Sequence, residues 1–358
     1  MDDFLIIGGG IAGLSAGARL AELGRVRVLE AESAPGYHAS GRSAAMYEPT
    51  YGAAPVVALN EASGDFFFGS DGLLSPRGLL MVAIAGEEEA FSAGTKAMRM
   101  QRLSLEEARA MVPVLDPERI TQAGYHAEAW DIDTDRLLQL FAREIRTHGG
   151  TVETGQRVRR IGRNNDGWHV ETGTGQYRAT ILVNAAGAWA DQIAQMAGLR
   201  PLSITPYRRS MARVAAPEGT GVNDWPMLFG PGETWYAKPD AGALLVSPAD
   251  ESATEPHDAW AEDMTLAEGI AKYEERVTAP VTRMLANWAG LRSFAPDRNL
   301  VIGPDPAEPR FLWMAGQGGY GFQTAPAASR LLADLADGRA PELDPTTVQA
   351  LSPARFQP

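Results

Sequence analysis

The stretch Phe4-Leu5-Ile6-Ile7-Gly8-Gly9-Gly10-Ile11-Ala12-Gly13 decides the fold of this chain. Its first four residues are apolar and predict a buried parallel strand, and the glycines that follow match the pattern G-x-G-x-x-G. Apolar residues at helical spacing over 14–23 predict a helix, and 26–29 predicts a second strand that ends in Glu30. This order of strand, glycine turn, helix, strand and acid predicts a dinucleotide-binding α/β unit.

Each glycine of this pattern has a physical role. Gly8 permits the tight turn, Gly10 lets the backbone approach a pyrophosphate, and Gly13 lets the helix pack closely on the strand. The helix N-terminus offers free N–H groups and a positive dipole end to the phosphates. Glu30 follows at the distance where an acid accepts hydrogen bonds from a ribose diol. A glycine-rich turn that binds no ligand would not explain why a helix, a second strand and an acid follow it at these spacings.

Composition narrows the class further. The chain has 358 residues, a formal net charge of −13 and no cysteine, which excludes disulfides, thiolate metal sites and cysteine nucleophiles. An acidic surface repels phosphate backbones, so no nucleic-acid partner is expected. Stretches of about 20 apolar residues and a basic leader are both missing, so we expect a cytoplasmic protein with no integral membrane segment. The histidines show no metal-binding spacing, and we expect no metal.

Later segments return to the first domain. Small residues dominate 35–45, which suits close approach to a large flat ligand but equally fits a plain surface loop. Residues 180–190 predict a strand that ends in a small-residue turn and a helix. Residues 311–316 predict another strand, which enters the glycine-rich turn 317–321 before a helix from about 325 to 337. A dinucleotide domain therefore opens and closes the chain, and the middle supplies a second domain.

Taken together, several motifs resemble one family of flavoproteins. Gly8–Gly13, Gly41–Ala45, Val183–Trp189, Trp288–Ser293 and Gln317–Gly321 are similar to the FAD-dependent D-amino-acid oxidase/dehydrogenase family, above all to its D-arginine dehydrogenase branch. The resemblance implies an α/β fold: a Rossmann-like FAD-binding domain of the D-amino-acid oxidase/glutathione-reductase type, with a mixed-sheet α+β substrate domain. We expect the FAD domain in 1–75, 131–200 and 295–350, the substrate domain in 76–130 and 201–294, and a tail in 351–358.

The resemblance also implies the cofactor and the reaction. FAD would be bound non-covalently, and a D-amino acid would lose a hydride from Cα to flavin N5, giving an imine that water hydrolyses to a 2-oxo acid and ammonia. No general base is nominated, because orientation suffices once the amine is neutral. The expected cofactor contacts are Gly8, Gly10, Ile11, Ala12, Gly13, Glu30, Ala31, Gly41, Arg42, Ser43, Ala44, Ala45, Met46, Val158, Ala186, Gly187, Trp189, Gly318, Gly319, Tyr320, Gly321, Phe322 and Gln323.

Substrate residues follow from chemistry and resemblance together. Arg292 follows an apolar run, and its planar fork suits a carboxylate. Tyr236 lies in an alternating segment where a phenol can donate to that carboxylate. Tyr51 and Arg209 match substrate-contacting positions of the family; Arg208 and Arg209 are adjacent on a strand, so only one of them points inward. The resemblance assigns the backbone carbonyl of Gly319 to the substrate amine.

Two departures from the family bear on the substrate. The D-arginine dehydrogenases carry a glutamate after Ser-Pro-Arg-x, where this chain has Leu79, and a histidine where this chain has Met46. A leucine cannot pair with a guanidinium, and an unpaired buried cation costs several kcal/mol. We therefore predict neutral, apolar or aromatic D-amino acids over basic ones. Glu48, two residues after Met46, would restore a cation contact if its side chain points inward.

Other readings remain open. One alternative is a flavoenzyme of the same fold that oxidises glycine, sarcosine or another secondary amine, or a 2-hydroxy acid. A NAD-dependent dehydrogenase would show no flavin absorbance, and a non-catalytic FAD-binding protein would carry flavin that no substrate bleaches. The electron acceptor is open between oxygen, a quinone and an electron-transfer protein.

Overall fold

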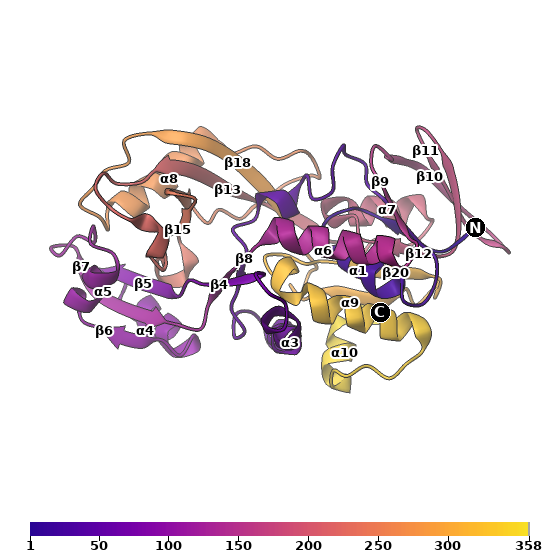
Figure 1. Ribbon diagram of the computed structural model, residues 1–358, viewed down its shortest axis with the longest axis horizontal. Coiled ribbons are helices and arrows are strands. Elements are labelled where there is room, and N and C mark those ends of the chain that lie inside the picture. Colours follow the sequence, from indigo (N-terminus) through magenta and orange to yellow (C-terminus); the bar gives the residue numbers. More distant parts are fainter. Residues whose placement is uncertain (357–358) are drawn as a thin grey trace.

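The computed structural model describes residues 1–356 and shows an elongated molecule of two lobes (Figure 1). The first lobe is built on an eight-stranded sheet whose central strands, β12, β1, β2 and β9, run parallel. Its order is β10 (Val158–Asn164), β11 (Gly167–Thr172), β12 (Gln176–Asn184), β1 (Asp2–Ile7), β2 (Val26–Leu29) and β9 (Thr151–Glu153), with β20 (Phe311–Ala315) on β12 and β19 (Val301–Pro304) on β20. This is the α/β fold that the glycine motif predicts.

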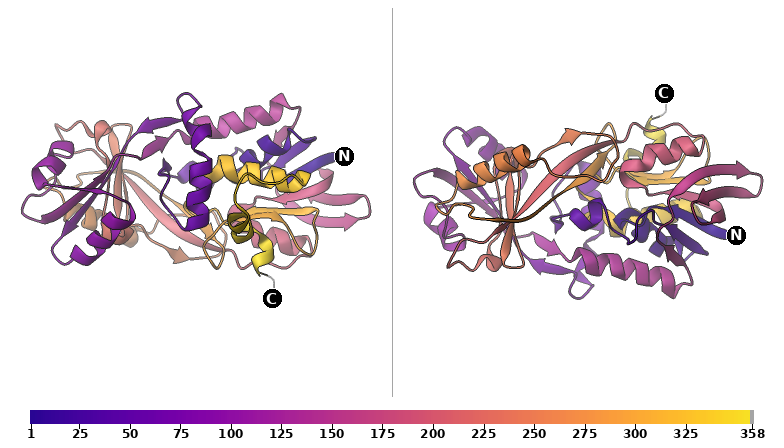
Figure 2. Two further views of the ribbon diagram at one scale, coloured as in Figure 1. Left: turned by 90° about the horizontal axis from the view of Figure 1, so that it is seen from below. Right: turned by 90° about the horizontal axis from the view of Figure 1, so that it is seen from above.

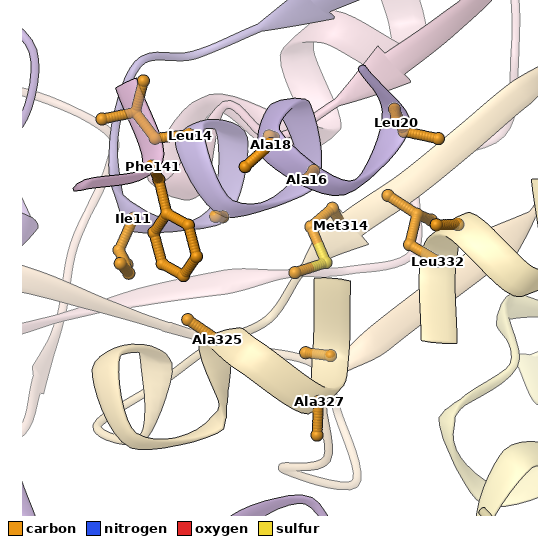
Figure 3. Close-up of a cluster of buried hydrophobic side chains, with 14 of the residues drawn as sticks. Ile11, Leu14, Ala16, Ala18, Leu20, Phe141, Met314, Ala325, Ala327 and Leu332 are labelled. Carbon is orange, nitrogen blue, oxygen red and sulfur yellow. The ribbon is translucent and has the colours of Figure 1, made fainter. Parts of the chain in front are cut away.

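Helix α1 (Ile11–Leu20) forms the centre of the apolar core of this lobe. It begins three residues earlier than the sequence predicted, because Gly10 already serves as its N-cap. Helices α6 (Thr134–Thr147) and α9 (Gly321–Asp337) both pack against it. Figure 3 shows Ile11 of α1 near Phe141 of α6, with Ala325 of α9 below them. The small residues of α1 allow these helices to approach closely.

The second lobe is a nine-stranded mixed sheet. Its order is β17 (Ser252–Ala253), β13 (Thr205–Ala215), β16 (Ala243–Ser247), β15 (Tyr236–Asp240), β14 (Met227–Phe229), β5 (Leu79–Ile84), β7 (Ile120–His126) and β6 (Gln101–Leu103), with β18 (Met284–Phe294) on β13. Only the β14–β5 pair is parallel. The long strands β13 and β18 run from this lobe toward the first lobe (Figure 2). Their ends therefore carry side chains to the junction of the two lobes.

A small sheet and several helices complete the junction and the surface. The small sheet has the order β3 (Met46–Tyr47), β8 (Trp130–Ile132) and β4 (Leu74–Pro76). The remaining helices are α2 (Ala54–Ala62), α3 (Gly64–Phe68), α4 (Glu88–Ala97), α5 (Leu105–Met111), α7 (Ala190–Met196), α8 (Asp263–Glu274) and α10 (Pro345–Leu351). A single turn of 3-10 helix, Ala39–Arg42, lies in the small-residue segment that the sequence left without structure.

Strand positions can be compared with the expected domains. The first sheet takes all its strands from 1–75, 131–200 and 295–350, and the second takes all of its own from 76–130 and 201–294. The small sheet draws on both sides of that division, which itself stays a prediction. Within the expected tail, residues 353–356 form a 3-10 turn, and Arg355 there binds Asp297 and the carbonyls of Asn299 and Leu300. Residues 357 and 358 lie outside the described residues.

Candidate active site

The N-terminus of α1 opens into a cavity of about 400 Å³ at the carboxyl ends of β1 and β2. Gly8 adopts φ +109°, and a Cβ there would lie 2.3 Å from the carbonyl oxygen of Ala185. A Cβ on Gly13 would lie 1.8 Å from the carbonyl oxygen of Gly8, so only glycine permits this turn. Helix α1 has no acidic residue in its first turn. Its positive end is therefore available to an anionic group.

Two polar side chains line this end of the cavity. The buried Glu30 carboxylate accepts hydrogen bonds from the N–H groups of Gly9 (2.7 Å) and Glu32 (2.8 Å). Ser40 accepts from the N–H of Ile11 at 3.0 Å. Sequence analysis missed Ser40, and the only signal for it was its place in the small-residue segment. Both side chains therefore hold the backbone around the glycine turn, and the Glu30 carboxylate keeps lone pairs that can accept from a ribose diol.

Most expected cofactor contacts line two connected cavities. The large cavity is lined by Gly8, Gly10, Ile11, Ala12, Glu30, Ala31, Arg42, Val158, Ala186, Gly187, Trp189 and Gly318. It shares Ile11, Ser40, Leu291 and others with a second cavity of about 110 Å³. That second cavity is lined by Ser43, Ala44, Ala45, Met46, Gly319, Gly321, Phe322 and Gln323. A long ligand with a phosphate centre and a flat end fits this path.

Three expected cofactor residues do not line these cavities. Gly13 acts through helix packing, and a Cβ on Gly41 would lie 2.5 Å from the carbonyl oxygen of Gly36. The Tyr320 ring packs against Tyr51 and Phe294, with ring centroids 5.4 Å and 6.4 Å away. Its backbone is the N-cap of α9, and its expected contact with the cofactor stays a prediction.

Unpartnered polar atoms in the large cavity indicate a polar ligand. Ser293 Oγ and Gln317 Nε2 are buried, line this cavity and have no hydrogen-bond partner within residues 1–356. Buried polar groups nearly always have partners, so these two are suited to a bound molecule. The free N-terminus of α9 lies at the second cavity, where a positive dipole end stabilises negative charge on a reduced flavin ring. The residues present therefore fit FAD.

Arg42 lines both the large cavity and the second cavity. Its guanidinium donates to the carbonyls of Ala259 and Ala289, both at 2.9 Å, and pairs with Asp258. The Arg42 guanidinium holds the pKa of the Asp258 carboxyl below its usual value. Arg42 thus lines the cavity while its charge ties the small-residue segment to 258–259 and β18.

A third cavity, of about 130 Å³, contains the expected substrate residues. Tyr51, Leu79, Arg209, Tyr236, Arg292, Gly319 and Met46 all line it. Arg209 on β13 stands opposite Gly290, and Arg292 on β18 stands opposite Tyr207, so both arginines share one face of this strand pair. Arg208 faces the other side, where it pairs with Glu262 at 2.5 Å. Arg209 is therefore the inward member of the adjacent pair.

Burial sets the electrostatics of this cavity. Burial and the neighbouring Arg292 lower the pKa of the Arg209 guanidinium from its usual value. Two carboxylates lie near Arg209: Glu251, at 3.9 Å, and Asp250, whose charge opposes this lowering. Burial and Glu233, to which Tyr51 donates at 2.7 Å, raise the pKa of the Tyr51 hydroxyl well above its usual value. Two guanidinium groups in one cavity favour a carboxylate ligand beside them, because Glu233 in the same lining is already paired with Tyr51.

The rest of the lining is largely apolar and includes Leu79, Met98, Met227 and Phe229. Two acids also line the cavity, and one of them, Glu233, already accepts the hydrogen bond from Tyr51. Glu48 lines the same cavity, and its side chain is 5% exposed. Sequence analysis left the direction of Glu48 open, and the structure turns it inward.

Lys238 is a further residue that sequence analysis missed. It is buried, and its ammonium group donates to the carbonyls of Ala44 (3.1 Å) and Ala45 (3.4 Å) and pairs with Asp131 at 2.8 Å. Lys238 therefore holds the backbone that lines the second cavity. The only sequence signal was its place two residues after Tyr236, because alternate residues of a strand share a face.

The described residues also bear on metal sites and on membrane insertion. Groups of three or more histidine, aspartate or glutamate side chains that would suit a metal ion are not found within residues 1–356. None of the helices in that part of the chain is long and apolar enough to cross a bilayer.

The two lobes, the glycine turn and the connected cavities define a dinucleotide-binding oxidoreductase with its substrate cavity at the lobe junction. The family model described as FAD dependent oxidoreductase (DAO) matches residues 3–335. The chain therefore belongs to the DAO family of FAD-dependent oxidoreductases, and FAD is its cofactor. The expected fold class and the expected cofactor are both confirmed.

Individual relatives are distant. Glycine oxidase from Pseudomonas aeruginosa is 28% identical, and the match covers 95% of this chain and 96% of that protein. FAD-dependent oxidoreductase domain-containing protein 1 from Bos taurus is 26% identical over 93% of this chain and 80% of that protein. The crystal structure of L-proline dehydrogenase from P. horikoshii has a TM-score of 0.84 at 23% identity, over 99% of this chain and 97% of that one. The structural likeness shows the fold alone.

Proposed function

We propose that this chain oxidises the carbon–nitrogen bond of an amino acid, in the D-configuration, whose carboxylate binds Arg209 and Arg292. The observation that carries the proposal is the pair of guanidinium groups on one face of β13 and β18, facing a cavity next to the one that fits the flavin. An amino-acid carboxylate matches the planar fork of arginine. The likeness to the D-arginine dehydrogenase branch stays a prediction.

The other residues orient the substrate. Tyr236 lines the arginine side of the cavity and can donate to the carboxylate. The Tyr51 hydroxyl donates to Glu233 at 2.7 Å, its raised pKa keeps it protonated, and it would have to leave Glu233 to reach the carboxylate. Gly319 lines both the second and the third cavity, so its backbone is placed to meet the substrate amine between them. Fixed orientation of this kind supplies much of the rate of a hydride transfer.

The chemistry balances with FAD as the oxidant. The residues of the two connected cavities would hold FAD, which would supply a two-electron oxidant for the Cα–H and amine N–H bonds of the substrate; the imine product would take up water to give a 2-oxo acid and ammonia. We propose non-covalent binding of FAD and a cytoplasmic location. The acceptor that reoxidises the flavin is oxygen, a quinone or an electron-transfer protein.

Side-chain preference is the finer part of the proposal. Leu79 and Met46 underlie the prediction of neutral, apolar or aromatic substrates, and both line the third cavity. Glu48 lines the same cavity and works against a purely neutral preference. Glycine or a small secondary amine is the second candidate, supported by the match to the Pseudomonas aeruginosa glycine oxidase.

An anaerobic titration tests the reaction. The flavin absorbance of the holoenzyme near 450 nm is followed while D-Met, D-Leu, D-Phe, D-Lys, their L-forms, glycine and sarcosine are added one at a time. Bleaching by D-amino acids supports the proposal. Bleaching by glycine or sarcosine alone replaces it with the second candidate, and a flavin that no amino acid reduces contradicts both.

A further inference from the structure

Glu48 is a buried acid with one free oxygen. Its Oε1 accepts hydrogen bonds from the backbone N–H (3.1 Å) and the hydroxyl (2.7 Å) of Thr50. His126 Nε2 lies 3.3 Å from the same oxygen. Oε2 is buried and has no hydrogen-bond partner anywhere in the part of the chain that the structure describes. A buried carboxylate oxygen without a partner is costly, so a ligand atom is the group that would satisfy it.

Strand alternation points Glu48 into the cavity. Tyr47 is buried in the core of the first lobe, where its hydroxyl donates to the carbonyl of Asn60 at 3.0 Å. Its neighbours Met46 and Glu48 therefore turn the opposite way, and both line the third cavity. The backbone N–H of Glu48 donates to Gln323 Oε1 at 3.1 Å, which fixes this segment against the start of α9.

Glu48 lies on the same side of the third cavity as Leu79. His126, which touches the Glu48 carboxylate, stands directly opposite Leu79 in the β5–β7 pair. The carboxylate thus belongs to the Leu79 wall, whereas Arg209 and Arg292 come from the β13–β18 pair. A molecule that fills the cavity meets cations at one place and an anion at another.

We propose that Glu48 Oε2 binds a positively charged nitrogen at the end of the substrate side chain, an inference that rests on the proposed binding of an amino acid in this cavity. The apolar residues Met46, Leu79 and Met227 contact the aliphatic stem, and Glu48 binds the terminal ammonium or guanidinium group. A substrate of this class carries a carboxylate, a methylene stem and a cationic end. This revises the neutral preference that Leu79 predicts, because a different residue supplies the acid.

The physical reason is charge balance in a buried place. A neutral side chain would leave Oε2 without a partner, and it would keep the full desolvation penalty of the carboxylate. A cation gives that oxygen a charge-assisted hydrogen bond. His126 does not fill this role, because it faces Oε1.

A binding experiment tests the proposal without catalysis. Hexanoate and 6-aminohexanoate share a carboxylate and a stem, differ by the terminal ammonium group, and lack an α-amino group. Dissociation constants are measured with the holoenzyme from the perturbed flavin spectrum. We expect 6-aminohexanoate to bind at least tenfold more tightly than hexanoate. Equal or tighter binding of hexanoate overturns the proposal, and this comparison needs no variant.

Variants then assign the effect to Glu48. In Glu48→Gln the preference for 6-aminohexanoate should fall at least tenfold, while hexanoate binding stays the same or improves. Glu61→Gln, which removes an equal charge from an exposed position on α2, should leave both constants unchanged. A preference that survives in Glu48→Gln contradicts the assignment.

Turnover separates this inference from the proposed function. We expect a higher kcat/KM for D-lysine than for D-norleucine, which has the same stem without the amine, and a reversal in Glu48→Gln. Bleaching by D-norleucine with no preference for D-lysine overturns the inference and leaves the proposed function intact. A preference for 6-aminohexanoate with no bleaching by any amino acid supports the Glu48 site and overturns the proposed reaction.

Discussion

Arg209 and Arg292 lie diagonally across the β13–β18 pair, and both guanidinium groups line one cavity. Two guanidinium groups that line one cavity repel each other. Burial and the charge of Arg292 both lower the pKa of the Arg209 guanidinium. Such a pair is stable when an anion lies between its members. The arrangement therefore supports the proposed binding of a carboxylate by these two residues.

Arg292→Met should lower kcat/KM for every amino-acid substrate by about 100-fold or more, because losing one partner of a buried ion pair costs roughly 3 kcal/mol. Flavin content should stay normal, since the cofactor cavities keep their glycine turns. Arg208→Met is the matched control, because Arg208 faces away from the cavity toward Glu262. Unchanged kcat/KM in Arg292→Met would show that the substrate carboxylate does not bind at this site.

Gly13→Ala should abolish FAD binding or prevent folding. A Cβ at this position would lie 1.8 Å from the carbonyl oxygen of Gly8, which α1 cannot avoid without leaving the strand. The ratio of flavin to protein absorbance of the purified variant measures the effect. Gly162→Ala on β10, where a Cβ meets nothing within 4 Å, should retain full flavin. Normal flavin content in Gly13→Ala would show that the helix moves more freely than this contact implies.

The Arg42–Asp258 pair should give a pH-dependent difference between wild type and Asp258→Asn. Because Arg42 lowers the pKa of Asp258, the pair stabilises the fold at pH values above the unfolded pKa of about 4, and this contribution is lost as pH falls through the lower folded value. The Asp258 side chain is 54% exposed, so we expect less than about 1 kcal/mol at neutral pH. The melting temperatures of wild type and Asp258→Asn should differ at pH 7 and converge as the pH falls below the folded pKa of Asp258. A constant gap would contradict the ionic origin.

Lys238→Met should lower kcat about tenfold or more. The buried ammonium group holds the carbonyls of Ala44 and Ala45, and misplacing a reacting geometry by about 1 Å can cost 100-fold. Asp131 keeps Arg77 as a partner at 2.7 Å, which limits the loss of stability. Lys272→Met, which removes an exposed contact to the carbonyl of Thr234, is the control. Equal kcat in both variants would mean that the Ala44–Ala45 backbone needs no lysine.

Local sequence predicted the first lobe well. The glycine turn, the two strands beside it and the acid Glu30 are close in sequence, and their geometry follows from steric rules that act over a few residues. The boundary of α1 differed by three residues because helix starts depend on capping. The packing of the Tyr320 ring against Tyr51 and Phe294 was not predicted, because a glycine motif specifies the backbone and says little about where a neighbouring ring packs.

The substrate cavity was only partly predictable. Alternation on a strand explains why Arg209 faces the cavity while Arg208 does not, once the face is known. Lys238 and Ser40 were missed because their partners lie far away in sequence: Ala44 is 194 residues from Lys238, and Ile11 is 29 residues from Ser40. No local pattern reports such contacts.

Sequence alone determined the strand, glycine turn and helix of a dinucleotide-binding unit at Gly8–Gly13, since backbone sterics and a helix dipole need no distant partner. Only the tertiary structure decided that Glu48 lies in the same cavity as Arg209 and Arg292, with Oε2 free of partners within residues 1–356. Arg209 and Arg292 lie on β13 and β18, Glu48 directly follows β3, and only the packing of the two lobes brings these segments together. The charge pattern of the substrate site is therefore a property of the folded chain.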